Sequence, residues 1–333
     1  MKYLMCMLLM VAGQALAQPL NEVLARWDSD EHRDLRSVLV MRNGAIVAER
    51  YYNGETADTL HDIRSAGKSI TALLVGAAAD RGKLGAQDRI GQLWPAARGT
   101  ALADITLDQV LTMRSGLAAF DEDPASPGNE DKMDEAADPV AFALATPAET
   151  APGTRYRYNS LTAYVAGITV EQATSTDLEV FARTTLFAPL GIQHWKWLRD
   201  AANHPKGQGN LFLRPRDLGK IGQMVLDQGM YHGRRIISDS WLKAALAPRV
   251  SISDSDPYAD HYGYFWYQKT HRIGGRDIVV HFASGNGGNK LYVIPALKSV
   301  VVITSRAYGK GYGQRRSANI LAAILAIMPE PLK

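Results

Sequence analysis

The sequence predicts an α/β protein of the α+β type, in which one antiparallel sheet is built from both chain ends and flanked by helices. Near the N-terminus, residues 37–47 form two apolar runs around Asn43-Gly44, the strongest short signal for a tight hairpin. Near the C-terminus, four strand-like runs occupy residues 262–268, 277–283, 290–294 and 299–305. Helical patterns dominate between these regions, so we expect an α-rich lobe over about residues 84–210, inserted into the sheet domain.

Helical spacing of apolar residues predicts the other elements. After Ser65 these residues recur on one helical face until Arg81-Gly82, a basic last turn followed by a glycine. The same spacing predicts helices over residues 216–230, 238–247 and 317–328. The acidic segment 120–135 lacks the ligand spacing of a calcium-binding loop, so we interpret it as a solvated loop.

The first seventeen residues have the pattern of a secretory signal peptide. Lys2 supplies the positive charge, residues 4–12 the apolar run, and Ala15-Leu16-Ala17 a small-x-small cleavage site. We therefore expect cleavage after Ala17, a mature chain of residues 18–333, and a periplasmic or secreted protein. The one cysteine, Cys6, lies in the leader, so the mature chain is expected to lack disulfides.

Composition excludes several function classes. The formal net charge is only +3 and no block of basic residues occurs, so nucleic acid is not expected as a partner. No second apolar stretch is long enough to cross a bilayer, so we expect no integral membrane segment in the mature chain. None of the eight histidines has zinc-binding spacing, and no metal or organic cofactor is expected. The oligomeric state is not indicated.

The clearest chemical signal is Ser65-Ala66-Gly67-Lys68 at the start of a predicted helix. Three residues make nearly one turn, so the serine hydroxyl and the lysine amine project from the same face. A serine becomes a good nucleophile when a nearby base takes its proton, and a lysine can do so where burial or charge lowers its pKa. The helix N-terminus also favours developing negative charge. An N-cap serine followed by a solvated lysine would show the same four residues, so this motif alone does not decide.

Two other segments offer the groups that such a nucleophile requires. Tyr158-Asn159-Ser160 follows a Pro-Gly-Thr turn, and a tyrosine near an amine can act as a general base. Later, the glycine-rich segment that contains Gly285 and Gly287 leads into a strand. Glycines there let a ligand approach the backbone, as an oxyanion hole of main-chain N–H groups requires. Packing tyrosines and a flexible hairpin turn are the structural alternatives.

Together these segments resemble the serine β-lactamase and penicillin-binding-protein superfamily. The resemblance is greatest to its class C β-lactamase-like branch of esterases, D-amino-acid peptidases and aminohexanoate-oligomer amidases. It spans nearly the whole mature chain, through DIRSAGKSITALLVGAAADRGKL, ITLDQVLTMRSGL, PGTRYRYNSLTAYVAG and RPRDLGKIGQMVLDQGMYHGRRIISDSW. It implies a β-lactamase/transpeptidase-like fold with Ser65 as nucleophile, Lys68 as its partner and Tyr158 as the motif tyrosine. It also implies that the Asn286 N–H belongs to the oxyanion hole.

The chain departs from the family pattern at two motifs. Ser160 stands third in the tyrosine motif, where asparagine is common. The third motif, residues 282–285, has no lysine, whereas true β-lactamases have Lys-Thr-Gly there. His281 is a nearby group that could replace the missing charge, and Lys290 lies beyond the glycines, too far along the strand. We therefore expect little or no hydrolysis of β-lactams.

These features predict an exported serine hydrolase that cleaves an ester or amide bond of a small molecule or peptide through an acyl-enzyme. Two alternatives remain open. One is a β-lactamase or D,D-peptidase that acts on cell-wall peptides. The other, of a different class, is a catalytically silent module that binds peptidoglycan or a protein partner. The physiological substrate is not indicated.

Overall fold

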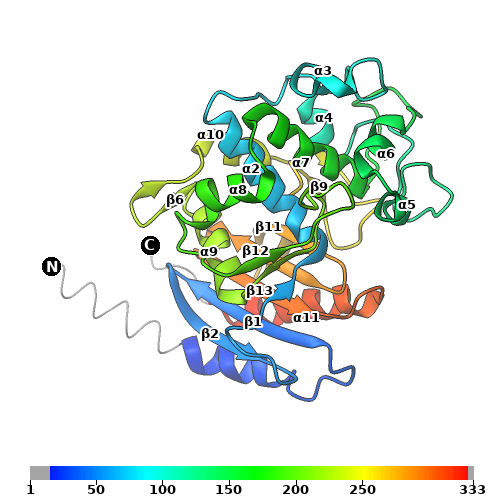
Figure 1. Cartoon of the computed structure of the whole chain (residues 1–333). Helices are drawn as coiled ribbons and strands as arrows, with labels where there is room; N and C mark the ends of the chain where they lie inside the picture. Colours follow the sequence, from blue (N-terminus) through cyan, green and yellow to red (C-terminus); the bar gives the residue numbers. More distant parts are fainter. Residues whose placement is uncertain (1–15, 329–333) are drawn as a thin grey trace.

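A computed structural model describes residues 16–328, and its largest feature is a sheet of eight strands (Figure 1). The spatial order is β2-β1-β13-β12-β11-β10-β9-β8, and neighbouring strands are antiparallel. Strand β1 (Leu35–Arg42) pairs with β13 (Ser299–Ser305), so that Leu39 lies opposite Val302. The predicted fold class, with a sheet made from both ends of the chain, is confirmed.

The other elements have the following bounds. The remaining strands are β2 (Ala45–Tyr51), β3 (His61–Asp62), β4 (Trp195–Trp197), β5 (Leu211–Leu213), β6 (Met230–Tyr231), β7 (Arg234–Arg235), β8 (Val250–Ser251), β9 (His261–Tyr262), β10 (Tyr267–Ile273), β11 (Arg276–Gly285) and β12 (Asn289–Ile294). The helices are α2 (Gly67–Ala79), α3 (Ile90–Leu93), α4 (Leu107–Leu111), α5 (Glu130–Glu135), α6 (Pro139–Ala145), α7 (Ser160–Thr174), α8 (Leu178–Ala182), α9 (Pro215–Leu226), α10 (Asp239–Leu246) and α11 (Gly311–Ile327). Residues 16–25 are also helical.

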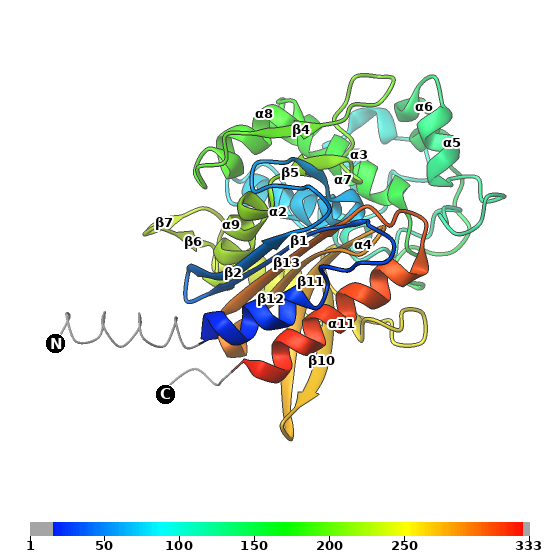
Figure 2. The ribbon, with the colours of Figure 1, turned by 90° about the horizontal axis from the view of Figure 1, so that it is seen from below.

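Helices cover both faces of the large sheet (Figure 2). Helix α11 and the helix of residues 16–25 lie on one face, while α2 and α9 lie on the other. Gly222 of α9 packs so closely that a Cβ atom there would come within 2.6 Å of Leu291 and Val300. Leu20 and Leu24 are fully buried on the opposite side. The sheet therefore has a core on each of its faces.

The segment predicted as an α-rich lobe, residues 84–210, contains α3 to α8 and gathers beyond one face of the sheet (Figure 1). Its central helix, α7, is buried continuously from Ser160 to Glu171 and packs against α2. Asn159 begins α7, because its side-chain oxygen accepts a hydrogen bond from the N–H of Thr162 at 2.7 Å. Helices α2 and α7 bring Lys68 and the tyrosine motif together.

Several local signals are confirmed. Asn43 and Gly44 both have positive φ angles, 50° and 80°, as a two-residue hairpin turn of the favoured kind requires. Helix α2 ends at Ala79, and Gly82 adopts a φ of 64° just beyond it. Ser238 caps α10 through a bond from the Trp241 N–H. Turn and cap residues therefore determine where these helices and strands begin or end.

Two elements are shorter than predicted. The helix expected over residues 216–230 ends at Leu226, because Gln228 and Gly229 take left-handed φ angles of 54° and 87° and lead into the β6–β7 hairpin. The aromatic run 262–268 is divided by a turn, with Phe265 at a φ of 56°. Its aromatic side chains are buried, and Tyr264 donates to Asp108 of α4 at 2.6 Å. Hydrophobicity alone did not reveal the break in this run.

Two other expectations also need correction. The acidic segment 120–135 is only partly a loop, because α5 forms within it with Asn129 as its N-cap. Helix α11 begins at Gly311, six residues before the predicted start. Contacts with residues near the N-terminus stabilise the polar first turns of α11. Tyr312 donates to Asp34 at 2.5 Å, and Arg316 pairs with Asp30 at 2.7 Å.

The predicted leader falls mainly on residues 1–15, outside the described part of the chain. Within residues 16–328, no helix combines the length and the hydrophobicity needed to cross a bilayer.

Candidate functional site

Ser65 lies in a short 3-10 turn, Arg64–Ala66, directly before α2. Arg64 has a φ of 52°, a left-handed conformation that costs a residue with a side chain roughly 1–2 kcal/mol. The Asp62 carboxylate accepts a hydrogen bond from the Arg64 N–H at 2.8 Å and holds the turn. This strained connection presents Ser65 at the N-terminal end of α2, one turn before Lys68.

Lys68 is only 1% exposed, and its amine is surrounded by oxygen atoms. Nζ donates to Ser65 Oγ at 3.0 Å, to Ser160 Oγ at 2.9 Å and to the Gln208 carbonyl at 3.0 Å. An ammonium group has three N–H donors and no acceptor, so these three bonds use its full capacity. Each of these three oxygens can accept a hydrogen bond from a charged lysine.

Electrostatics favour the charged form of this lysine. Burial of the ammonium acts to lower the pKa of Lys68, but the nearby Tyr158, Glu130 and Asp121 outweigh burial and raise this pKa. The lysine therefore keeps its proton at neutral pH. The sequence left the direction of this pKa shift open, because it did not show which negative groups gather around the amine.

Tyr158 is the phenol beside this amine. The Lys68 Nζ lies 5.0 Å from the centroid of the Tyr158 ring, and Asn159, the next residue, caps α7 and fixes the loop. Tyr156 points elsewhere, because its ring packs edge-on against Tyr262 at 5.3 Å. Burial raises the pKa of Tyr156 well above its usual value, so this phenol stays protonated. Tyr158 is thus the tyrosine that lies beside Lys68.

The glycine-rich end of β11 meets the turn that carries Ser65. A Cβ atom on Gly285 would lie 2.1 Å from the Ile63 carbonyl oxygen and 3.2 Å from the Ala66 nitrogen. Only glycine allows this approach, and it brings the backbone of Asn286 close to the Ser65 turn. Asn286 is fixed in turn, because its side-chain oxygen accepts from the Gly309 N–H at 2.8 Å.

Gly287 completes the predicted binding set on this loop. It adopts a φ of 85°, and a Cβ atom there would lie 3.0 Å from the ring of Tyr308. The loop therefore packs tightly between the Ser65 turn and residues 307–309. The structure thus brings together the predicted Ser65, Lys68, Tyr158, Ser160, Gly285, Asn286 and Gly287.

Sequence reasoning missed the segment Gly207-Gln208-Gly209, which forms one wall of the site. Besides the Gln208 carbonyl that binds Lys68, Gly209 packs against the nucleophile turn, where a Cβ atom would lie 3.1 Å from the Arg64 carbonyl oxygen. The closely spaced glycines were the available signal, because they permit close backbone contact.

Glu130 is the second group that sequence reasoning missed. It is the first residue of α5, and its carboxylate lies near the Lys68 amine and the Ser160 hydroxyl. Burial raises the pKa of Glu130, and the Lys68 charge opposes this shift. A carboxylate near the lysine can share its proton, so Glu130 belongs to the same ionisable cluster.

The family model described as Beta-lactamase matches residues 27–325 of the chain. The chain belongs to the beta-lactamase family. It is therefore a serine hydrolase, which confirms the predicted resemblance and the prediction of an enzyme.

Individual relatives agree with this assignment. The chain is 25% identical over 284 residues to the 6-aminohexanoate-dimer hydrolase of Paenarthrobacter ureafaciens, with 79% of this chain and 70% of the relative covered. Two solved structures share the fold. A family VIII carboxylesterase has a TM-score of 0.72 at 16% identity, with 92% of this chain and 97% of that chain covered. A class C beta-lactamase has a TM-score of 0.70 at 17% identity, with 96% and 98% covered.

His281 does not supply the cation that the third motif of this beta-lactamase-family chain lacks. It lies four residues before Gly285 on β11, about 13 Å away along the strand. Burial lowers the pKa of His281 to about 4, so the imidazole is neutral at pH 7. Its Nδ1 atom also has no hydrogen-bond partner within residues 16–328.

Lys290 lies much closer to the third motif than its place in the sequence indicated. The turn after Gly285 reverses the chain, so Lys290 pairs with Ser284 and its Nζ donates to Ser284 Oγ at 2.6 Å. The expectation that Lys290 lies too far away was therefore wrong. The amine nevertheless lies on the α11 face of the sheet, because the next residue, Leu291, faces α9.

The burial of His281 predicts a specific loss of stability in acid. The unfolded state takes up a proton near pH 6.5, but the folded state does so only near pH 4, so stability falls as the pH drops between these values. We expect the free energy of unfolding to fall by up to about 3 kcal/mol from this cause. His281→Phe should remove this pH-dependent loss. Urea unfolding of both proteins at pH 7 and pH 4.5 measures it. An unchanged difference between the two pH values would contradict the prediction.

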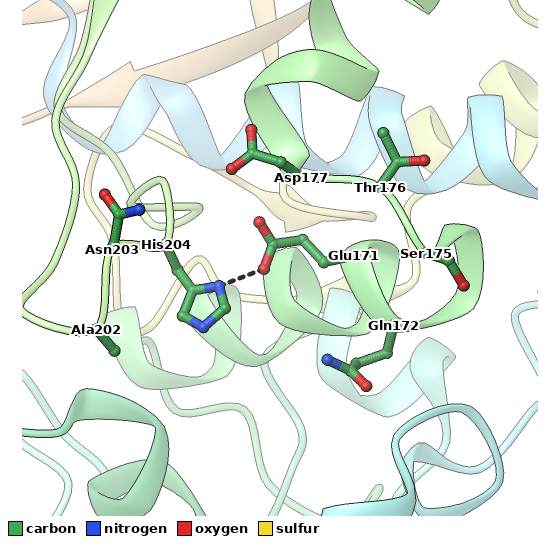
Figure 3. A pocket seen from close by; sticks show the side chains of 8 residues that line it. All are labelled: Glu171, Gln172, Ser175, Thr176, Asp177, Ala202, Asn203 and His204. Atoms are coloured by element: carbon green, nitrogen blue, oxygen red, sulfur yellow. Dashed lines mark hydrogen bonds and ion pairs between the residues drawn. The ribbon is translucent and has the colours of Figure 1, made fainter.

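A hollow of about 400 Å³ lies at the far end of α7, roughly 16 Å along the helix from Ser160 (Figure 3). His204 and Glu171 point toward one another there, with Nδ1 and Oε2 2.5 Å apart. The other Glu171 oxygen accepts from the Leu178 N–H at 2.9 Å, at the start of α8. These contacts tie α7 to its neighbours, so we assign the hollow a structural role.

Across residues 16–328, no group of three or more His, Cys, Asp and Glu side chains could hold a metal ion.

Proposed function

We propose that this beta-lactamase-family protein is an exported hydrolase that cleaves an ester or amide bond through an acyl-enzyme on Ser65. The observation that carries the proposal is the Lys68 ammonium, which donates to Ser65 Oγ at 3.0 Å while two other oxygens take its remaining protons. Negative groups around Lys68 raise its pKa, so the lysine keeps its own proton and does not take the serine proton. The base is then a neighbour of Lys68, and we assign this role to Tyr158, whose ring centroid lies 5.0 Å from the amine.

The acylation step follows from these positions. The Tyr158 phenolate, stabilised by the Lys68 charge, takes the Ser65 proton as Oγ attacks the carbonyl carbon. The N–H groups of Ser65 and Asn286 stabilise the oxyanion. When the tetrahedral intermediate collapses, Tyr158 returns the proton to the departing alcohol or amine. The acyl group then remains as an ester on Ser65.

Deacylation reverses these roles with water as the nucleophile. Tyr158 takes a proton from the water molecule, which attacks the acyl carbon in the same oxyanion site. The Ser65 oxygen leaves and recovers the proton, and the product acid is released. Both steps use the same base, so a single cluster around Lys68 serves the whole cycle.

Two relatives support the type of bond in this proposal, and the N-terminal sequence supports export. The relative from Paenarthrobacter ureafaciens is named a 6-aminohexanoate-dimer hydrolase, which favours an amide bond, and one structure with the same fold is a carboxylesterase. The Ala15-Leu16-Ala17 pattern favours export to the periplasm or beyond. Labelling by a fluorophosphonate probe tests the nucleophile directly. A peptide map should show the adduct on Ser65, and an unlabelled but folded protein would contradict the proposal.

The substrate class can be tested by a comparison of esters with a β-lactam. We expect p-nitrophenyl acetate and butyrate to be hydrolysed faster than nitrocefin at pH 7, measured as kcat/KM. Lys290 is 3% exposed and faces α11, so a β-lactam carboxylate lacks a charged partner beside Ser65. A lost charge-assisted hydrogen bond costs about 1.5–3 kcal/mol, or roughly 10- to 150-fold. Nitrocefin turnover as fast as that of the esters would instead favour a β-lactamase.

Glu130 provides a test of the ionisable cluster. We expect Glu130→Gln to lower kcat by roughly 10- to 100-fold, since the loss of its charge changes the proton affinity of Lys68. The pH profile of kcat should shift as well. Glu135→Gln, at the exposed end of the same helix, is the matched control and should leave both quantities unchanged. An unshifted profile for Glu130→Gln would remove Glu130 from the cluster.

A further inference from the structure

A second cavity lies on the opposite side of the sheet from α2, beneath α11. Its volume is about 270 Å³, and residues of α11 and of strands β10 to β12 line it. Much of its wall is hydrocarbon or aromatic, from Phe282, Tyr292 and Leu321. Ser65, Lys68 and Tyr158 do not line it. The cavity is therefore separate from the proposed catalytic site.

Lys290 brings a positive charge into this apolar cavity. The residue is 3% exposed, and its Nζ donates to Ser284 Oγ at 2.6 Å and lies 4.9 Å from the centroid of the Phe282 ring. In the part of the chain from residue 16 to 328, no carboxylate forms an ion pair with this amine. Asp256 acts on it only from a longer range. Two of the three ammonium protons thus lack a strong acceptor.

A comparison with a neighbouring lysine shows how unusual this is. Lys269 also lines the cavity, but its amine pairs with Asp260 at 2.7 Å. Buried charges in proteins are normally paired, since isolation from water is costly. Desolvation accordingly lowers the pKa of Lys290 to about 8, which still leaves most of the amine charged at pH 7. The site has a cation, an apolar wall and room for a small molecule.

We propose that this cavity binds a small carboxylic acid, whose carboxylate pairs with Lys290 while its apolar body lies against Phe282, Tyr292 and Leu321. A monoanion matches the single unpaired cation, and a compact aliphatic chain or one aromatic ring matches the walls. A charge-assisted bond to Nζ would satisfy a donor that the protein leaves without an acceptor. The proposal does not depend on the reaction at Ser65.

The cavity also touches the active-site strand. Gln314 lines it and donates through Nε2 to the Gly285 carbonyl at 2.9 Å, while its Oε1 has no partner among residues 16–328. Ser284, which accepts from Lys290, precedes Gly285 directly. An acid bound to Lys290 is therefore connected through Ser284 to Gly285. The peptide bond after Gly285 carries the Asn286 N–H that we propose for the oxyanion hole.

The experiment is a calorimetric titration of the full-length protein with benzoate, with benzamide and benzylamine as uncharged and cationic probes of the same shape. We expect benzoate to bind with a Kd on the order of 1 mM or tighter, and the other two at least about tenfold more weakly. Lys290→Met keeps the side-chain volume and should weaken benzoate at least about tenfold. Lys269→Met is the matched control and should keep the wild-type affinity, because Asp260 already pairs with that lysine.

Ala318→Phe provides an independent variant, because it fills the cavity from α11 without a change in charge. It should abolish benzoate binding, and it decides the outcome if Lys290→Met fails to fold. The proposal is overturned if the folded wild-type protein shows no saturable benzoate binding, or if benzamide binds as tightly. Unchanged benzoate affinity in Lys290→Met or Ala318→Phe also overturns it.

Discussion

Ser65→Ala should lower kcat for ester hydrolysis by on the order of 10⁶-fold, the effect of removing the nucleophile from a serine hydrolase. The substitution deletes one oxygen atom that accepts a bond from Lys68 at 3.0 Å, and it leaves the Arg64–Ala66 turn intact. Methyl replaces hydroxymethyl without a clash. The melting temperature should therefore stay close to that of the wild-type protein, and steady-state hydrolysis of p-nitrophenyl butyrate measures the loss.

Ser69→Ala is the matched control, four residues later on the same segment. Its hydroxyl donates to the Phe265 carbonyl at 2.5 Å and is buried, so it supports the fold. We expect this variant to lose about 1 kcal/mol of stability and to keep most of the activity. If Ser65→Ala retained more than a few per cent of wild-type turnover, the nucleophile would have to be another residue.

Lys68→Met and Tyr158→Phe should each lower kcat on the order of 10³-fold, and the double variant should be scarcely worse than the poorer single. The reason is that the Lys68 charge acts by stabilising the Tyr158 phenolate, so the loss of either group removes the same proton path. Methionine fills the buried space of the lysine stem. Single and double variants are compared by kcat at saturating ester, over a range of pH.

Tyr156→Phe is the control for the tyrosine. Its ring packs against Tyr262 and its pKa is raised by burial, so the loss of the hydroxyl should change kcat less than about tenfold. Multiplication of the two single losses in the double variant would mean that Lys68 and Tyr158 act independently. In that case the phenolate mechanism would be wrong, whatever the size of the single effects.

Signals that reside in a few consecutive residues were readable from the sequence. Asn43-Gly44 specified its hairpin through positive φ angles, and Ser65 and Lys68 share a helical face because of their spacing alone. The tyrosine motif and the glycine-rich motif identified Ser160 and Gly285 as candidate site residues. Their distances from Lys68 and from the Ile63 carbonyl depend on packing, but the family pattern already grouped them.

Contacts between segments that lie far apart in the sequence could not be predicted from it. Gln208 accepts a bond from Lys68 across 140 positions of the chain, and Glu130 reaches the same amine from an acidic segment that looked solvated. The pKa of Lys68 depends on such neighbours, so the sequence could not give the direction of its shift. Lys290 was misplaced because a hairpin turn makes distance along the chain a poor measure of distance in space.

The pairing of β1 with β13 sets an order of events during synthesis. The hairpin of residues 35–51 is synthesised long before its partner strand at 299–305. Gly285, which abuts the Ser65 turn, also arrives late. A nascent chain can therefore carry both Ser65 and Lys68 for most of its synthesis without an assembled site. Activity would begin only when β11 to β13 join the sheet, and such non-local closure is a slow step in folding.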